Sequence, residues 1–326
     1  MGTRLQVSSL LDKRLYFGLN KKMSTVPLFP DFKPIEIGDR PGMIDLLREH
    51  RPGTSELTFT NLFIWRKHFN FQWSRHSECL CVIGRENSGP DFALAPVGPC
   101  DRMDAGSAVL RWLKETKGVR APAIERADEA LAAEAARLSG LTVEEKREHF
   151  DYVYLTRDLI DLPGNRNRNK RNHINQFFRA YRSYVYEEFN DRHIEAALNL
   201  QEKWCTLRRC EEDLNLLGEW DAIREILSHY RALEVAGAVI IVEGEVKAFT
   251  FGEPLSDDMA LIHIEKADPG IPGLYQLINQ QFCARRWDQM KFINREQDLG
   301  IPGLREAKLS YNPDHFVKKY SISLNR

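Results

Sequence analysis

Two ionisable side chains of the second half lie two positions apart in an apolar stretch. His263 and Glu265 interrupt the segment 260–266, and a strand there would present both on one face. If that face lines a cleft, the pair can carry acid–base catalysis. If Ile262 and Ile264 face the core instead, the polar pair simply faces solvent. The pattern leaves both interpretations open.

Two carboxylates follow the next strand-like stretch, 290–294, which ends in Asn294. Glu296 and Asp298 follow this stretch directly, and two carboxylates there could bind a cationic amino group. The alternative is that they form turns around Gly300.

A third cluster has helical spacing. Arg305 and Lys308 are three residues apart, and Tyr311 follows one turn later, so the three side chains share a helix face. A cation beside a reacting ester can stabilise the oxyanion of the tetrahedral intermediate, and we assign this role to Lys308. The same cations could neutralise the phosphate of a nucleic acid, or form a surface pair without function.

The loop Pro269–Gly273 precedes a predicted helix. Backbone N–H groups at such a helix N-terminus favour an anion, which makes Gly270 and Gly273 candidate binding residues. Two prolines remove N–H donors from the loop, which argues against a simple acetyl-CoA enzyme. A stiff turn without a ligand is the alternative.

A basic segment lies in the middle of the chain, directly after the breaker Asp161–Gly164. Its cations are Arg166, Arg168, Lys170 and Arg171. Such a run is commonly a solvated linker, but four phosphate contacts would bind an RNA backbone in a salt-sensitive way. We predict that the four side chains form one wall of a groove between two domains.

The elements that must position these residues follow from periodicity. In the second half we expect strands at 238–242, 246–252 and 260–266, a helix at 274–286, a strand at 290–294, a helix at 303–309 and a closing strand at 316–324. The first half repeats part of this order, with a helix expected at 125–139. The prediction is an α/β fold with two similar domains, 25–160 and 161–326, after a weakly ordered extension at 1–24.

Two segments carry a resemblance to a known family. They are Asp268–Gln276, leading into Lys291–Gly300, and Gly303–Pro313, followed by Lys318-Lys319-Tyr320. Together they resemble the C-terminal domain of phosphatidylglycerol lysyltransferases and a related soluble family of unknown function. The resemblance covers roughly 166–326, and the first half only by element order. It implies tandem Gcn5-related acyltransferase domains, with mixed, mainly antiparallel sheets flanked by helices.

The resemblance also implies a donor. The lysyltransferases, and the related Fem-type peptidoglycan transferases, use aminoacyl-tRNA. The lysyltransferases carry a multi-helix membrane domain that this sequence lacks, so the acceptor is left open among small molecules, lipids and peptides.

The composition excludes some classes of binding partner. The chain has 46 Lys and Arg against 47 Asp and Glu, a net charge of −1, so nucleic acid or anionic lipid is not held by bulk charge. Its longest apolar runs, such as Ala238–Val242, are far shorter than the roughly 20 residues that span a bilayer. The six cysteines form no CxxC pair, which predicts reduced thiols, no metal site and a cytoplasmic location.

The sequence therefore predicts acyl transfer, from aminoacyl-tRNA to an amine or hydroxyl acceptor, without a cofactor or a covalent intermediate. Two alternatives remain. One is an acetyl-CoA-dependent N-acetyltransferase, and the other is a non-catalytic RNA-binding or regulatory protein that has kept the fold.

Overall fold

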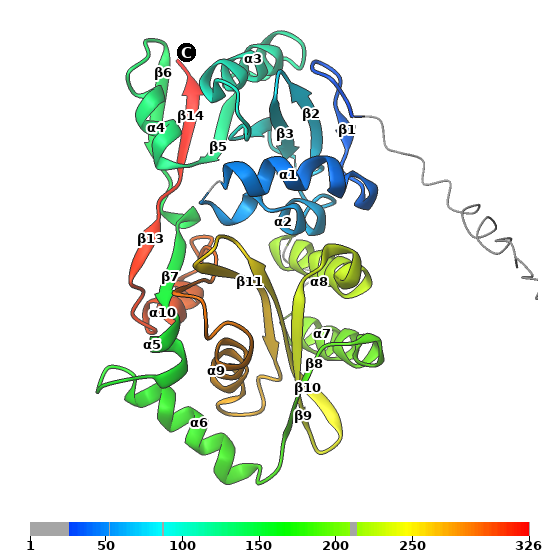
Figure 1. The fold of residues 1–326 in the computed structure, drawn as a ribbon, viewed down its shortest axis with the longest axis vertical. Helices are drawn as coiled ribbons and strands as arrows, with labels where there is room; N and C mark the ends of the chain where they lie inside the picture. Colours follow the sequence, from blue (N-terminus) through cyan, green and yellow to red (C-terminus); the bar gives the residue numbers. More distant parts are fainter. Residues whose placement is uncertain (1–25, 52, 87, 209–213, 326) are drawn as a thin grey trace, which may run out of the picture.

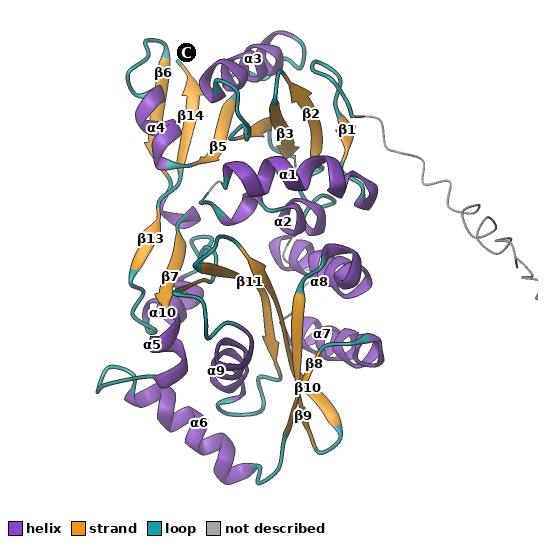
Figure 2. Ribbon diagram, viewed as in Figure 1, coloured by secondary structure: helices purple, strands orange, loops and turns teal. Residues whose placement is uncertain are grey.

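Two seven-stranded sheets, one above the other in Figure 1, form the framework of the protein. The computed structural model describes residues 26–51, 53–86, 88–208 and 214–325. The expected extension at 1–24 lies outside these residues. Helices cover the faces of both sheets (Figure 2).

The first sheet has the strand order β1 (Lys33–Pro34), β2 (Gln72–His76), β3 (Cys79–Arg85), β4 (Asp91–Leu94), β5 (Ala123–Ala127), β14 (Tyr320–Leu324) and β6 (Leu141–Glu145). The second has the order β13 (His315–Val317), β7 (Asp151–Leu155), β12 (Phe292–Asn294), β11 (Met259–Ala267), β10 (Glu245–Pro254), β9 (Ala236–Val242) and β8 (Val185–Glu188).

Each sheet contains one parallel ladder among antiparallel ones. In the first sheet β4 runs parallel to β5, and in the second β11 runs parallel to β12. This arrangement agrees with the predicted fold of two similar, mainly antiparallel α/β halves. The shared parallel ladder relates the two halves, although no repeat is visible in the sequence.

The two sheets do not divide at residue 160, where the sequence placed a boundary. Strand β7 precedes that point but pairs with β12 and β13 of the second sheet. Strand β14 closes the chain and returns to the first sheet, between β5 and β6. The chain therefore crosses between the halves twice, and its C-terminus completes the first half.

The closing strand expected at 316–324 is accordingly two strands. β13 ends at Val317, and Lys318 and Lys319 carry the chain from one sheet to the other. A continuous alternating pattern hides this break, because a strand that changes partners keeps its period of two.

The helix expected at 125–139 is also two elements. Residues Ala123–Ala127 form β5, and the carboxylate of Asp128 accepts a hydrogen bond from the Leu131 N–H, which caps α4 (Glu129–Ala135). An N-cap aspartate begins a helix, so the residues before it belong to the preceding strand. The following strand β6 was not predicted.

Helices of the first half are α1 (Arg40–His50), α2 (Phe59–Ile64), α3 (Arg102–Glu115) and α4; those that follow are α5 (Thr156–Asp161), α6 (Arg168–Ala180), α7 (Ile194–Arg208), α8 (Leu214–Leu233), α9 (Leu274–Arg286) and α10 (Pro302–Leu309). Helix α9 has the bounds expected from its apolar spacing. It buries Leu274, Leu277, Ile278 and Phe282 against the second sheet. None of the helices among the described residues is both long enough and apolar enough to cross a membrane.

Helices α7 and α8 cover the other face of the second sheet, toward the first half (Figure 1). One apolar core joins residues of the first half, such as Phe63, to Ile223 of α8 and Phe249 of β10. The halves are thus held by a shared core as well as by the two chain crossings.

Candidate active site

The second sheet opens where β11 and β12 stop pairing. Their parallel register runs from Met259 opposite Phe292 to Leu261 opposite Asn294, and β12 ends there. The Asn294 side chain accepts a hydrogen bond from the Glu296 N–H at 2.8 Å, and Glu296 adopts a left-handed backbone with φ of 58°. This local turn leads the chain away from β11 and opens the space that the site residues fill.

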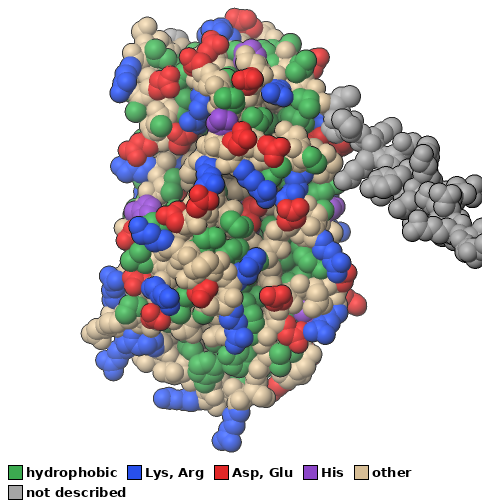
Figure 3. All heavy atoms as spheres, in the orientation of Figure 1, with side chains coloured by type: hydrophobic (Ala, Val, Ile, Leu, Met, Phe, Trp, Pro, Cys, Tyr) green, Lys and Arg blue, Asp and Glu red, His purple; other side chains and the backbone are tan. Residues whose placement is uncertain are grey.

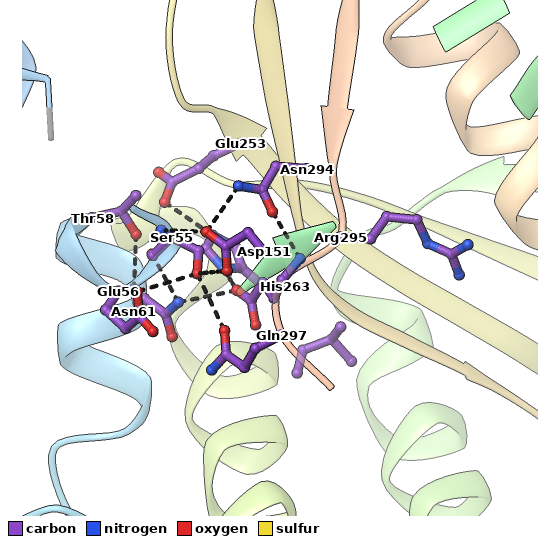
Figure 4. A network of polar contacts seen from close by, with 12 residues as sticks. Ser55, Glu56, Thr58, Asn61, Asp151, Glu253, His263, Asn294, Arg295 and Gln297 are labelled. Carbon is purple, nitrogen blue, oxygen red and sulfur yellow. Dashed lines mark hydrogen bonds and ion pairs between the residues drawn. The ribbon is translucent and has the colours of Figure 1, made fainter. Parts of the chain in front are cut away.

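His263 lies in this opening between two carboxylates. Its Nδ1 is 3.0 Å from Glu296 Oε1, and its side chain is fully buried. Its Nε2 is 3.0 Å from Glu253 Oε1 (Figure 4). Burial opposes the charge, but the hydrogen bonds and charges of Glu253 and Glu296 outweigh it and raise the His263 pKa to about 9.

His263 is therefore an imidazolium at neutral pH, with both N–H groups donated to carboxylates. It cannot accept a proton in this state. The expected acid–base pair of His263 and Glu265 is not formed, because each of the two residues has a different partner. The role that the geometry allows His263 is electrostatic.

Two side chains from outside β11 donate to Glu265, one from α9 and one that follows β12. Arg295 Nη2 donates to its Oε1 and Asn279 Nδ2 donates to its Oε2, each at 2.9 Å. The Arg295 guanidinium also lies 4.9 Å from the centre of the Tyr311 ring. Glu265, Arg295 and Tyr311 thus form one cluster beside α9.

Lys308 reaches this opening from α10. Its Nζ donates to the carbonyl oxygens of Arg295 and of Glu296, the latter at 3.1 Å. Burial, together with the nearby Arg295 charge, lowers the Lys308 pKa to about 8. An ammonium has three donors, and these contacts use two of them. Lys308 therefore points toward Glu296 and not into bulk solvent, which the role assigned to it requires.

Asp298 and Arg305 bind each other rather than a ligand. Arg305 donates to both carboxylate oxygens, from Nε at 2.8 Å and from Nη2 at 2.9 Å, and Tyr152 Oη donates at 2.5 Å. The Asp298 side chain is fully buried. The expected joint binding of an ammonium by Glu296 and Asp298 is therefore wrong for Asp298, whose oxygens already hold the loop before α10. Arg305 and Lys308 do not point the same way either.

A second buried network joins the two halves beside His263, and sequence reasoning missed it. Lys319 Nζ lies 2.6 Å from Glu56 Oε2 and 2.6 Å from Asp151 Oδ1, and its side chain has no solvent exposure. Asp151 also accepts hydrogen bonds from Ser55 Oγ and from Asn294 Nδ2 (Figure 4). The Lys318-Lys319-Tyr320 motif was the available signal, but it does not tell which lysine is buried.

The first half also contributes directly to the His263 network. Asn61 of α2 donates from Nδ2 to Glu296 Oε1 at 3.0 Å, the same oxygen that faces His263. The Thr58 hydroxyl caps α2 by accepting from the Asn61 N–H, which fixes the start of that helix. The candidate site is thus built from both halves.

The loop Pro269–Gly273 is not an open anion site. A Cβ atom on Gly273 would lie 2.0 Å from the His173 carbonyl oxygen, so α6 passes directly over the N-terminus of α9. The Gly270 N–H already donates to Asp268 Oδ1 at 2.9 Å. The expectation for Gly270 and Gly273 is corrected accordingly: Gly273, with φ of +82°, permits close packing of two helices.

The basic segment lies at the start of α6, on the side of the second half away from the first (Figure 1). It therefore does not form a wall between the halves. Arg166 pairs with Asp158 at 3.1 Å, Arg171 donates to the carbonyls of Leu162 and Gly164, and Lys170 donates to Ser310 Oγ at 2.6 Å. Among the charged side chains at this lower end of the molecule, Figure 3 shows more basic than acidic ones.

Arg168 is the member of the segment that is exposed and forms no ion pair with a described residue. Arg179 and Arg182, at the other end of α6, share this property among the described residues. Exposed arginines that form no ion pair with a described residue thus lie near both ends of α6, and not only in its first turn.

One expectation about cysteines is wrong. Cys79 and Cys100 form a disulfide with a Cα–Cα distance of 5.6 Å. Leu80 and Val97 pair as a β-bridge next to these cysteines, which brings together residues that the sequence separates. Cys81 and Cys283 are free and buried, and Cys210 lies outside the described residues. Within the described residues no group of three His, Cys, Asp or Glu side chains is placed to hold a metal ion.

Comparison with known proteins shows what this chain is similar to. Residues 48–323 match the family model described as phosphatidylglycerol lysyltransferase, C-terminal. A conserved protein of unknown function from Bacteroides thetaiotaomicron is 32% identical; the match covers 90% of this chain and 99% of that chain, with a TM-score of 0.82. An uncharacterized protein of Mycoplasmoides gallisepticum is 23% identical over 213 residues, which are 62% of this chain and 68% of that protein.

Two more distant structures show the fold alone. L-PGS from Bacillus licheniformis is 15% identical, with 93% of this chain and 95% of that chain covered and a TM-score of 0.60. FemX is 8% identical, with 90% and 97% covered and a TM-score of 0.55.

Proposed function

Since this chain belongs to the family of phosphatidylglycerol lysyltransferase C-terminal domains, we propose that it transfers an aminoacyl group from aminoacyl-tRNA to an amine or hydroxyl acceptor. Family and fold make it an acyltransferase-like protein related to lysyl-phosphatidylglycerol synthetases. The donor and the acceptor are our proposal. The observation that carries it is the position of Lys308, a cation of lowered pKa at the opening between β11 and β12.

Lys308 suits the stabilisation of negative charge. With a pKa of about 8 it is mostly protonated at neutral pH, and its third donor is not used by the carbonyls of Arg295 and Glu296. The carbonyl oxygen of an ester becomes an oxyanion when an acceptor attacks it. A preorganised ammonium next to that oxygen lowers the energy of the transition state.

Direct attack by the acceptor fits the described side chains better than a covalent intermediate. The two free cysteines of the described part of the chain are buried, and burial raises the pKa of Cys81 and of Cys283 to about 12. Such thiols stay protonated at neutral pH and are poor nucleophiles. The acceptor amine or hydroxyl then forms the new bond to the acyl carbon and gives up its proton. The bond from the acyl carbon to the ester oxygen of the tRNA breaks, and that oxygen takes up a proton and leaves as a hydroxyl.

The covered N-terminus of α9 favours this donor over acetyl-CoA. In the Gcn5-related fold that helix start is where a pyrophosphate would bind, but here α6 and Asp268 occupy it. The corresponding start of α3 in the first half is capped by the Asp101 carboxylate, which repels an anion. The exposed arginines of α6 offer phosphate contacts at the surface instead.

The first experiment is a set of binding titrations with aminoacylated tRNA, uncharged tRNA, bulk RNA and acetyl-CoA. We expect preferential binding of the aminoacylated tRNA. Binding of acetyl-CoA alone would replace the proposal by N-acetyl transfer. Equal affinity for all three RNAs, with no release of the amino acid to any acceptor, would favour the non-catalytic RNA-binding alternative.

A transfer assay then tests the assignment of Lys308. Radiolabelled aminoacyl-tRNA is incubated with amine and hydroxyl acceptors, and transfer by the unaltered protein is compared with transfer by Lys308→Ala. The matched control is Lys114→Ala, which removes an exposed lysine from the last turn of α3. Loss of transfer in the control as well would contradict the assignment.

A further inference from the structure

The buried side chain of Asn294 connects the candidate site to the interface between the two halves. Asn294 ends β12 and has no solvent exposure. Its Nδ2 donates to Asp151 Oδ2 at 3.1 Å (Figure 4), and its Oδ1 accepts from the Glu296 N–H at 2.8 Å. Both ends of the amide are thus occupied by protein groups, so Asn294 can influence a ligand only through its neighbours.

One of these neighbours is the peptide unit that holds Lys308. The Glu296 N–H belongs to the same peptide unit as the Arg295 carbonyl, to which Lys308 Nζ donates. A peptide unit is planar and trans, so its N–H and its C=O point in opposite directions. The hydrogen bond to Asn294 therefore fixes the direction of the carbonyl that faces the ammonium. It also supports the left-handed backbone of Glu296, a conformation that persists only where the surroundings impose it.

The other neighbour, Asp151, is bound by the first half. Its Oδ2 accepts from the Ser55 N–H at 3.0 Å, and its Oδ1 accepts from the Ser55 hydroxyl at 2.8 Å. Lys319 Nζ donates to the same Oδ1 at 2.6 Å. The side chains of Ser55, Asp151 and Lys319 are all buried. Because no water is at hand to replace a lost partner there, each of these hydrogen bonds is costly to break, and each group constrains the next.

We infer that Asn294 is a positioning residue, which makes the orientation of the Lys308 ammonium depend on how the two halves pack. The path consists of Ser55, Asp151, Asn294, the peptide unit shared by Arg295 and Glu296, and Lys308. A displacement of Ser55 relative to the second sheet pulls on Asp151 and Asn294. The peptide unit then turns, and its carbonyl moves away from the ammonium. The inference rests on the proposed function only for the claim that this orientation matters for transfer.

Breaking the path should lower the pKa of Lys308 below its value of about 8. Burial and the Arg295 charge already lower this pKa. Three nearby carboxylates raise it, and a tyrosine ring lies 5.7 Å from Nζ; these residues are Glu296, Asp151, Asp298 and Tyr152. A carbonyl that accepts from the ammonium stabilises the charged form, so the neutral amine is favoured when the Arg295 carbonyl turns away. One hydrogen bond to a charged group corresponds to a change of about 1 in the pKa.

The test compares two neutral variants of the full chain. Asn294→Ser keeps a hydroxyl that can accept from the Glu296 N–H, as serine does in turns of this kind, but it lacks the donor to Asp151. Asn294→Leu lacks both groups. The Lys308 pKa is measured by an NMR titration of protein with isotopically labelled lysine, in which the Lys308 signal is identified by its absence from Lys308→Arg. In both variants we expect this pKa to fall by about 1 and transfer at pH 7 to fall about tenfold or more.

The matched control is Leu110→Ala, which removes a buried side chain of α3 from the core of the first half. It should lower the melting temperature but leave the Lys308 pKa and transfer unchanged. An equal fall of the Lys308 pKa in this control would overturn the proposal, because the shift would then report loss of stability. A normal Lys308 pKa in Asn294→Ser would overturn it as well, since the local turn alone would position the lysine.

Ser55→Ala tests the link to the first half, because it removes the hydroxyl that donates to Asp151 at the far end of the path. It should lower the Lys308 pKa when Asn294 is present and have no further effect in the Asn294→Ser background. Additive effects of the two substitutions would contradict a path through Asn294. The NMR titration needs no substrate. If no protein shows transfer but the Lys308 pKa shifts as expected, the proposed function fails and the coupling through Asn294 is supported.

Discussion

His263 Nδ1 lies 3.0 Å from Glu296 Oε1 across the opening between β11 and β12, and the same oxygen accepts a hydrogen bond from Asn61 of the first half. The contact therefore joins three parts of the chain that are distant in sequence. It fixes the Glu296 backbone carbonyl, which in turn holds Lys308. A change in the charges around the Glu296 carboxylate should therefore alter both the stability of the protein and its activity.

Replacement of His263 should change how stability depends on pH. The folded pKa of about 9 lies above the ordinary value of 6.5, so the charged form stabilises the fold. This contribution, of about 3 kcal/mol, is fully present below about pH 6.5 and is lost as the pH rises toward 9. Denaturant unfolding of the unaltered protein should show that decline.

The variant His263→Gln should be less stable at pH 7, because it leaves Glu253 and Glu296 without a cation. Its free energy of unfolding should no longer fall between pH 7 and 9. If the decline persists unchanged in the variant, His263 does not carry the charge that we assign to it.

Lys308→Ala should reduce transfer by about 10²–10³-fold, and because it removes the donor to two backbone carbonyls it should also lower the melting temperature modestly. Lys308→Arg should rescue poorly, since a guanidinium fork does not replace an ammonium that donates to two carbonyls. If the cation is the active form, transfer by the unaltered protein should decline above pH 8. A rate that rises through this pH would instead indicate that the neutral amine acts as a base.

Lys319→Met should destabilise the protein by about 3–5 kcal/mol, because it leaves Asp151 and Glu56 buried without their cation. The neighbouring Lys318 is 46% exposed, and Lys318→Met is the matched control, with an expected change within about 0.5 kcal/mol. Adding Asp151→Asn to Lys319→Met should recover part of the loss. If chemical denaturation shows the same loss of unfolding free energy for both lysine variants, the buried ion pairs of Lys319 do not hold the two halves together.

The exposed arginines of α6 should carry RNA binding. Arg168→Ala/Arg179→Ala/Arg182→Ala should weaken binding and reduce the slope of log affinity against log salt by about 2. Arg166 and Arg171 are left in place, because their contacts with Asp158 and with backbone carbonyls support the fold. The control triple Arg111→Ala/Arg120→Ala/Arg137→Ala changes exposed arginines of the first half. An unaltered slope in the α6 variant would remove this surface from the proposal.

The disulfide should stabilise the first half. Cys79 and Cys100 are 21 residues apart, and closing a loop of that length contributes about 3 kcal/mol in the chain-entropy model. Cys79→Ala/Cys100→Ala should lower the melting temperature. A reductant should lower the melting temperature of the unaltered protein more than it lowers that of the variant. Identical effects of the reductant on both proteins would show that this pair is not the oxidised one.

Elements with a clear local pattern could be predicted from the sequence. Helix α9 was found at its bounds because its apolar residues recur at helical spacing, and β9, β10 and β11 were found as a hairpin and its neighbour. Strand β5 was missed because its residues merged with the helix pattern that begins at Asp128. Local signals are reliable where hydrophobic burial follows the period of one element, and fail where two elements of different period adjoin.

The candidate site was predictable only as a set of residue types. His263, Glu296 and Lys308 stand out in the sequence, but their partners do not.

By itself the sequence determined which side chains could do chemistry, and the elements of the second half that carry them. Only the tertiary structure decided that His263 faces Glu296 and Glu253 rather than Glu265, that Asn61 reaches Glu296 over 235 positions, and that Lys319 meets Ser55 over 264. Local periodicity reports which residues are buried, whereas ion pairing depends on which buried charges meet. In this protein that choice follows from the return of β14 to the first sheet, which carries Lys319 into the interface between the halves.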